Sequence, residues 1–263
     1  AFSASERVEL LSAAMAAYGT SGHGRPAREL LRPLRDALSL PASFTPLSVH
    51  VGVAWLRGVA HLGLPRLRRR PVAAAAEEPS ALSPGAALRL MWRATPSVLV
   101  IDSELSCQLA GRTLLLAARQ GEPAIYAQSL AFHMAALCLF TGTHSAAVER
   151  TFARAQRLVV EHGDDWEQAF VRVMRGAAAA HLWQHARAAA LCEDVAASRA
   201  RSTPYAASVR ALARTVYLPS LFQSGGLARG AELAEEYVRD ASACGDRQGE
   251  FGCRVVHAHT FLR

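Results

Sequence analysis

The stretch that decides the fold is DWEQAFVRVMRGAAAAHLWQHARAAALCEDV, residues 165–195. Its apolar residues recur at spacings of three and four, which is typical of two helices joined by a short turn. The first stripe is Phe170, Val173, Met174, Ala177, Ala178 and Leu182, and the second is Ala186, Ala189, Ala190 and Cys192. We expect Ala189 and Ala190 at a helix–helix contact, where no larger side chain fits. One hairpin cannot bury both of its faces, so the pattern predicts further copies beside it.

The hairpin pattern repeats downstream of Glu122. First helices are predicted to begin near Pro123, Asp165, Pro204 and Asp246, at intervals of 42, 39 and 42 residues. Turns within the pairs are predicted near residues 142, 184 and 225. A period of about 40 residues built from two helices predicts a tetratricopeptide-like helical-repeat solenoid of antiparallel helix pairs. The predicted fold class is therefore all-α.

The chain upstream of these repeats has a different organisation. Residues 1–65 are predicted to form a helical hairpin and one further helix near 47–62, with Pro33 bending the second helix. Residues 66–84 contain three prolines and clustered charge, which predicts a linker or irregular excursion. Residues 85–263 are assigned to the repeats, and a strand at Ser97–Ile101 is the alternative to the tail of a kinked helix.

Composition narrows the classes of function. All 29 basic residues are arginine and the net charge is +7, but their even spread favours a genomic codon bias over a surface for nucleic acid. The five cysteines are widely spaced without a C-x-x-C pair, which predicts reduced thiols. No apolar run reaches the roughly 18–20 residues of a membrane span, and the start does not resemble a secretion signal. We therefore expect a cytoplasmic protein, and the missing initiator Met suggests a segment of a longer chain.

Motifs of the common enzyme classes are missing from the sequence. There is no Walker A motif, no kinase H-R-D or D-F-G, no H-E-x-x-H and no G-x-S-x-G. Asp164, Asp165 and Glu167 form an acidic cluster, for which helix capping is a simpler explanation than metal binding. The ten histidines have no acid or cysteine partners at metal-ligand spacing. We therefore predict a non-catalytic segment without a metal or cofactor.

One candidate binding surface follows from the repeat. In helical-repeat folds the first helices of successive pairs line the concave surface. The residues that share one side of the two first helices are Gln168, Arg172, Arg175, Arg210, Arg214 and Tyr217. Arginine holds carboxylates and phosphates through a planar fork of donors, so this stripe predicts a groove for an acidic or phosphorylated protein segment. The alternative is an ordinary solvated helix face.

Two longer stretches carry a resemblance to a known family. They are RTLLLAARQGEPAIYAQSLAFHMAALCLFTG, residues 112–142, and HLWQHARAAALCEDVAASRARSTPYAASVRALARTVYLPSLFQSGGL, residues 181–227. They resemble the C-terminal repeat region of large bacterial serine/threonine protein kinases, in which a kinase domain precedes an ATPase module and tetratricopeptide-like repeats. The resemblance implies a regulatory repeat region attached to a kinase. It implies no catalytic residue in this chain, because the kinase motifs lie elsewhere in such proteins.

The expected function is therefore protein–protein interaction or the regulation of a tethered kinase or ATPase. Two alternatives stay open at this point. A ligand-sensing helical region of a transcription regulator would show a deep neutral pocket between hairpins. An all-α enzyme would show a buried acidic cluster on two facing helices.

Overall fold

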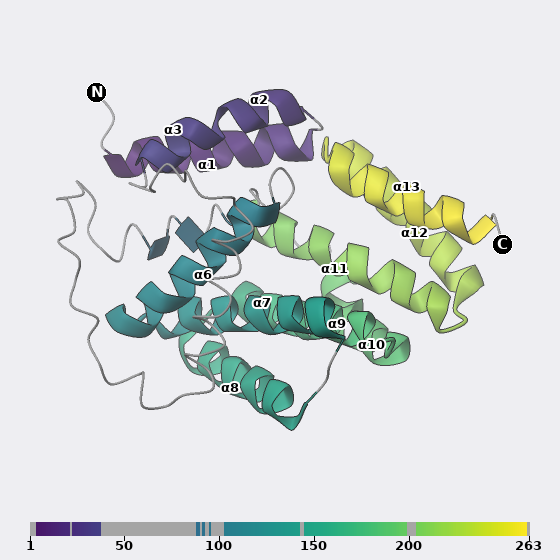
Figure 1. The fold of residues 1–263 in the computed structure, drawn as a ribbon. Coiled ribbons are helices and arrows are strands. Elements are labelled where there is room, and N and C mark those ends of the chain that lie inside the picture. Colours follow the sequence, from purple (N-terminus) through teal and green to yellow (C-terminus); the bar gives the residue numbers. More distant parts are fainter. Residues whose placement is uncertain are drawn as a thin grey trace. The chain divides into compact units, whose positions relative to one another are not determined.

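The computed structural model describes residues 4–21, 23–37, 88–89, 91–92, 95, 103–142, 145–198 and 204–261. Within these ranges the chain forms α-helices and no strand, which confirms the all-α prediction (Figure 1). The predicted helix near 47–62, the predicted linker and the alternative strand at Ser97–Ile101 lie outside the described residues. The chain divides into two compact units, one made of Ala1–Gly19 and Gly24–Ser129 and the other of Thr20–His23 and Leu130–Arg263.

The first unit begins with a broken helical hairpin. Helix α1 spans Ala4–Thr20, and the predicted second helix is present as two pieces, α2 (Gly24–Glu29) and α3 (Leu31–Ala37). Pro33 explains the break, because its ring has no N–H to donate and clashes with the carbonyl four residues earlier. The bend predicted from Pro33 is therefore confirmed, as an interruption at Leu30 rather than a smooth curve.

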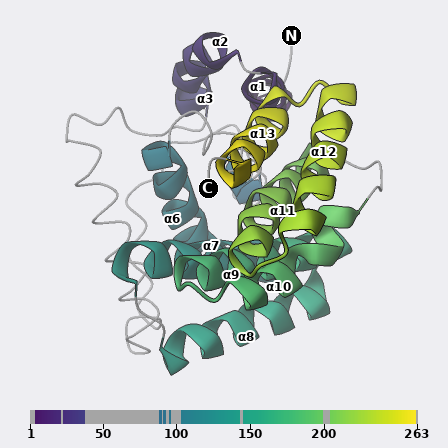
Figure 2. The same cartoon turned by 90° about the vertical axis from the view of Figure 1, so that its right-hand side faces the viewer.

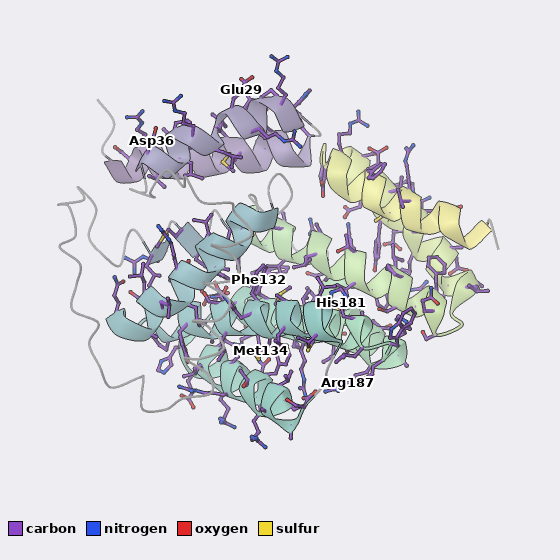
Figure 3. The ribbon with its side chains drawn as sticks, viewed as in Figure 1. Glu29, Asp36, Phe132, Met134, His181 and Arg187 are labelled. Atoms are coloured by element: carbon purple, nitrogen blue, oxygen red, sulfur yellow. The ribbon has the colours of Figure 1, made fainter. Side chains whose placement is uncertain are left out.

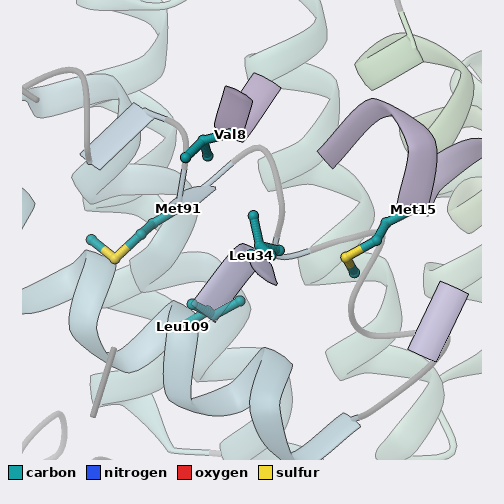
Figure 4. Close-up of a cluster of buried hydrophobic side chains, with 5 residues drawn as sticks. All are labelled: Val8, Met15, Leu34, Met91 and Leu109. Carbon is teal, nitrogen blue, oxygen red and sulfur yellow. The ribbon is translucent and has the colours of Figure 1, made fainter. Parts of the chain in front are cut away.

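An apolar cluster holds this unit together. Val8 and Met15 of α1, Leu34 of α3, Met91, and Leu109 of α6 (Ser103–Gln120) are all buried (Figure 4). Their burial removes apolar surface from water at about 25 cal/mol per Å². A buried polar pair lies in the same unit: the Trp92 indole N–H donates to the Gln128 side-chain oxygen over 2.9 Å.

The second unit is a succession of helices joined by short connections. Its helices are α8 (Ala146–His162), α9 (Asp165–His181), α10 (His185–Ala197), α11 (Pro204–Gln223), α12 (Leu227–Ala243) and α13 (Arg247–Phe261). Helix α7 (Pro123–Thr141) starts in the first unit and ends in the second. Helices α7, α9 and α11 begin at the predicted residues, α13 begins one residue after Asp246, and the turns at 142, 184 and 225 are confirmed.

Contacts in this unit run from each pair to the next. Helix α9 packs against α8, α10 and α11, α10 packs against both α9 and α11, and α11 packs against α12 and α13 (Figures 1 and 2). Small residues allow the closest approach: a Cβ added at Gly176 of α9 would lie 2.5 Å from Cys192 Sγ of α10. Helices α9 and α11 thus each touch the helix that follows them and the next helix but one.

The buried side of α10 differs from the predicted stripe. Ala188, Ala189 and Cys192 are buried, whereas Ala186 and Ala190 are exposed. Ala189 therefore lies at a helix contact as predicted, and the prediction for Ala190 is wrong. The reason is the helix period: positions 188, 192 and 195 share one side at spacings of four and three, and residues 186 and 190 face away from it.

Candidate functional site

The predicted stripe on α9 is engaged by neighbouring helices. Arg172 Nη1 lies 3.9 Å from Asp194 Oδ2 of α10, and Arg175 Nη2 lies 2.6 Å from Glu149 Oε2 of α8. Gln168 is half-buried. Both arginines of this helix therefore have an acidic partner within the same unit.

The predicted stripe on α11 turns toward the C-terminal end of α10. Arg210 donates to the Ser198 carbonyl over 3.4 Å, and Arg214 Nε donates to the Ala196 carbonyl over 3.1 Å. Terminal carbonyls of a helix have no partner within the helix and carry the negative end of its dipole, so basic side chains stabilise them. These two arginines thus act as caps for α10.

Arg214 and Tyr217 are interior residues, and the expectation that they lie on an exposed face is wrong. Arg214 is 8% exposed, its Nη1 lies 2.6 Å from Asp240 Oδ2, and its guanidinium carbon lies 4.2 Å above the Tyr237 ring. Tyr217 is also buried, and its hydroxyl donates to Glu193 over 3.3 Å. Burial and Glu193 raise the pKa of Tyr217, and burial raises the pKa of Tyr237 to about 12. Four of the six predicted groove residues (Arg172, Arg210, Arg214 and Tyr217) therefore have their partners on α10 or at its C-terminal end.

A different feature stands out at the turn between α9 and α10. Among the described residues, five have a positive φ: Gly121, Gly142, Trp183, Gly225 and Gly245. Four are glycines, for which this left-handed conformation carries no steric cost. Trp183 has φ +61°, a conformation that costs an ordinary L-residue about 1–2 kcal/mol.

The hydrogen bonds of this turn match those of the turns at Gly225 and Gly245. The Gln184 N–H donates to the Ala179 carbonyl over 2.9 Å and the Trp183 N–H donates to the Ala180 carbonyl over 3.0 Å. This is the Schellman pattern, in which glycine is the usual left-handed residue. In the next pair the Gly226 N–H makes the equivalent bond to the Leu221 carbonyl over 2.9 Å. Trp183 therefore occupies the position that Gly225 occupies in the turn between α11 and α12.

The Trp183 side chain gains little from the fold. Trp183 is 81% exposed, and its ring meets His185 edge-to-face with centroids 5.7 Å apart. Both ring nitrogens of His185 are buried without a hydrogen-bond partner in the described part of the chain. The sequence contained a signal that could have found this site: the expected glycine is missing from the turn Leu182–Gln184, and a tryptophan is present instead.

A charged cluster continues from this turn. The Gln184 side-chain oxygen accepts a bond of 3.0 Å from Arg187 Nη1, and Arg187 Nη2 lies 2.7 Å from Glu149 Oε1. The other oxygen of Glu149 meets Arg175, so one carboxylate lies between two guanidinium groups. Figure 3 labels Arg187 near the start of α10 and His181 at the end of α9, on either side of the turn. We define the Trp183 surface as Trp183, Gln184, His185, Arg187, Arg175 and Glu149.

The acidic cluster at the start of α9 is a helix cap. Asp164 accepts bonds of 2.8 Å from the N–H groups of Trp166 and Glu167, and Glu167 Oε2 accepts a bond of 3.0 Å from the Asp164 N–H. This reciprocal arrangement is a capping box, which confirms the capping interpretation. The described residues contain no group of three His, Cys, Asp or Glu side chains placed to hold a metal ion.

The remaining observations concern membranes and relatives. None of the helices in the described ranges is both long and apolar enough to cross a membrane. Comparisons of the chain with protein-family models, with curated proteins and with solved structures found no match.

Proposed function

We propose that the chain is a non-catalytic, tetratricopeptide-like helical-repeat module that binds a protein partner through the Trp183 surface. The repeat part of this proposal is supported by helix starts about 40 residues apart and by contacts that pass from each pair to the next. Repeats of this kind expose surface on every pair and act in many proteins as docking scaffolds.

The observation that carries the proposal is Trp183. The residue is 81% exposed and its backbone is strained, so neither burial nor local conformation explains tryptophan at this turn. Tryptophan and arginine are the residues most enriched among the few that dominate binding energy at protein interfaces. Here Trp183 lies beside Gln184, whose side chain is bonded to Arg187. The turn therefore offers a large aromatic anchor next to hydrogen-bond donors.

The resemblance to kinase repeat regions extends the proposal. In this extension the module works in the cytoplasm and its partner is a kinase or ATPase domain of the same larger protein, or a protein brought to that kinase. It rests on the sequence pattern alone. The test is the activity of the natural protein that carries this segment, measured with Trp183 and with Trp183→Ala; equal activity would contradict the regulatory role.

The binding proposal is tested by affinity capture from an extract of the source cells. Immobilised parent chain, Trp183→Ala and Val160→Ala are compared by quantitative mass spectrometry. Val160 of α8 is 59% exposed and serves as a matched apolar control outside the turn. We expect at least one protein to be recovered equally by the parent and Val160→Ala and about tenfold less by Trp183→Ala, as for an interface anchor. If no captured protein distinguishes the two variants, the proposal fails.

A further inference from the structure

The charged part of the Trp183 surface places two guanidinium groups on one carboxylate, as Arg247 and Arg254 also do around Glu250. Glu149 from α8 meets Arg175 from α9 and Arg187 from α10, with one guanidinium on each carboxylate oxygen at 2.6 and 2.7 Å. Two positive charges therefore face one negative charge, and the Arg175 Nε is buried without an acceptor within the described residues. All three side chains are partly accessible, at 27–37% of their area.

We propose that Glu149 is an internal occupant of a carboxylate site, and that a Glu or Asp side chain of a protein partner displaces it from Arg175 and Arg187. This inference rests on the proposed function, because it names the chemistry of the partner at the same surface. The carboxylate of Glu149 shows that the two guanidinium groups already fit a planar anion with two oxygens. Their surplus positive charge favours an acidic segment as the occupant.

Displacement is feasible because the internal pairs are weak. Ion pairs that remain partly in water contribute little, since solvent already screens the charges and each partner loses side-chain freedom. The partner gains a second contact that Glu149 lacks: an apolar group can cover Trp183 while the carboxylate binds the arginines. Gln184 accepts a bond from Nη1 of Arg187, which leaves Nη2 of Arg187 to meet the carboxylate.

The test is the direct binding of a labelled peptide to the protein and its variants. The probe is a fluorescein-labelled peptide of eight glutamates, with a peptide of eight phosphoserines beside it, and affinity is measured by fluorescence anisotropy at fixed ionic strength. Glu149→Gln is compared with Glu235→Gln, because each removes one negative charge and Glu235 pairs with Arg239 on α12, away from the turn. Arg187→Gln is compared with Arg239→Gln for the same reason.

We expect Glu149→Gln to bind the glutamate peptide about three- to tenfold more tightly than Glu235→Gln, because the competitor is removed. Arg187→Gln should bind it more weakly than Arg239→Gln by a similar factor. Glu149→Asp has a shorter side chain that lies farther from the arginines, so it should show a smaller gain in affinity. If circular dichroism shows that Glu149→Gln is unfolded, Glu149→Asp takes its place in the comparison.

Equal affinities for Glu149→Gln and Glu235→Gln, or a loss with Glu149→Gln, would overturn the inference and mark Glu149 as structural. A larger gain for the phosphoserine peptide than for the glutamate peptide would overturn the assignment to carboxylates. Neither result affects the Trp183-dependent capture described above. Loss of that dependence alone would reject the proposed function instead.

Discussion

Trp183 allows backbone strain to be separated from side-chain packing by two substitutions at one position. Trp183→Ala and Trp183→Gly both remove the ring. A tryptophan side chain has up to about 250 Å² of surface, of which roughly one fifth is buried here, so both variants lose about 1 kcal/mol of burial. They differ in what happens to the backbone at φ +61°.

The backbone term favours glycine. Alanine keeps a Cβ and therefore keeps the cost of the left-handed conformation, about 1–2 kcal/mol. Glycine removes this cost. Glycine also makes the unfolded chain more flexible, which lowers the stability of the folded state by about 0.5–1 kcal/mol. The expected order of stability is therefore Trp183 similar to Trp183→Gly, with Trp183→Ala about 1 kcal/mol lower. Because both variants lack the ring, both should lose the captured partner even though only one loses stability.

The assay is urea unfolding followed by circular dichroism at 222 nm, with the midpoint and slope fitted for each variant. The slopes should agree, because the same surface is exposed on unfolding. If Trp183→Ala is as stable as Trp183→Gly or more so, the left-handed conformation at this turn is not a cost to the fold. Backbone strain would then give no reason for a binding role of Trp183.

Three further predictions concern the packing of α10, α11 and α12. Arg214→Ala should lower the free energy of unfolding by about 2–3 kcal/mol in urea titrations, because Asp240 and the Ala196 carbonyl lose a mostly buried partner, while the partly exposed Arg210→Ala should cost under about 1 kcal/mol. Ala189→Leu should overpack the helix contact, destabilise the fold by about 1–3 kcal/mol and so lower the melting temperature. Ala190 is exposed, so Ala190→Leu should leave the melting temperature unchanged. Burial raises the pKa of Cys192 from 9.0 to about 12 and that of Tyr237 from 10.0 to about 12, so the folded state holds these protons more tightly than the unfolded state. The free energy of unfolding should therefore not change through these groups below pH 9, and it should fall between pH 9 and 12. An unchanged free energy of unfolding between pH 9 and 12 would contradict their burial.

The sequence predicts the helices of the second unit well because their signals are local. Pro123, Asp165 and Pro204 begin helices where the caps and the apolar period place them, and Pro33 interrupts a helix through its own ring. These features depend on residues within one or two turns of each other. No partner from a distant part of the chain is needed to establish them.

The candidate groove was predicted less well because its outcome depends on tertiary contacts. Arg214 and Tyr217 have the spacing of an exposed helix face, but Asp240 and Glu193 of the neighbouring helices pair with them in the interior. The long arginine stem is apolar, so a guanidinium that finds an acid, a carbonyl and an aromatic ring can be buried. Trp183, in contrast, could have been identified from the sequence alone. The absence of glycine at its turn becomes visible once the turns of successive helix pairs are aligned.

The arginine caps on α10 have a consequence for dividing the molecule into fragments. Helix α10 does not end on its own residues: the carbonyls of Ala196 and Ser198 are bonded by Arg214 and Arg210 of the following helix. In a fragment that stops between α10 and α11, only water could bond these carbonyls. Glu193 would also lose its hydrogen bond from Tyr217. The last turn of α10 should then fray, and its amides should exchange with solvent faster than those of the intact chain. Helices α9, α10 and α11 are thus the smallest excisable piece that keeps the α10 terminus closed, so this helix hairpin is completed by the helix that follows it.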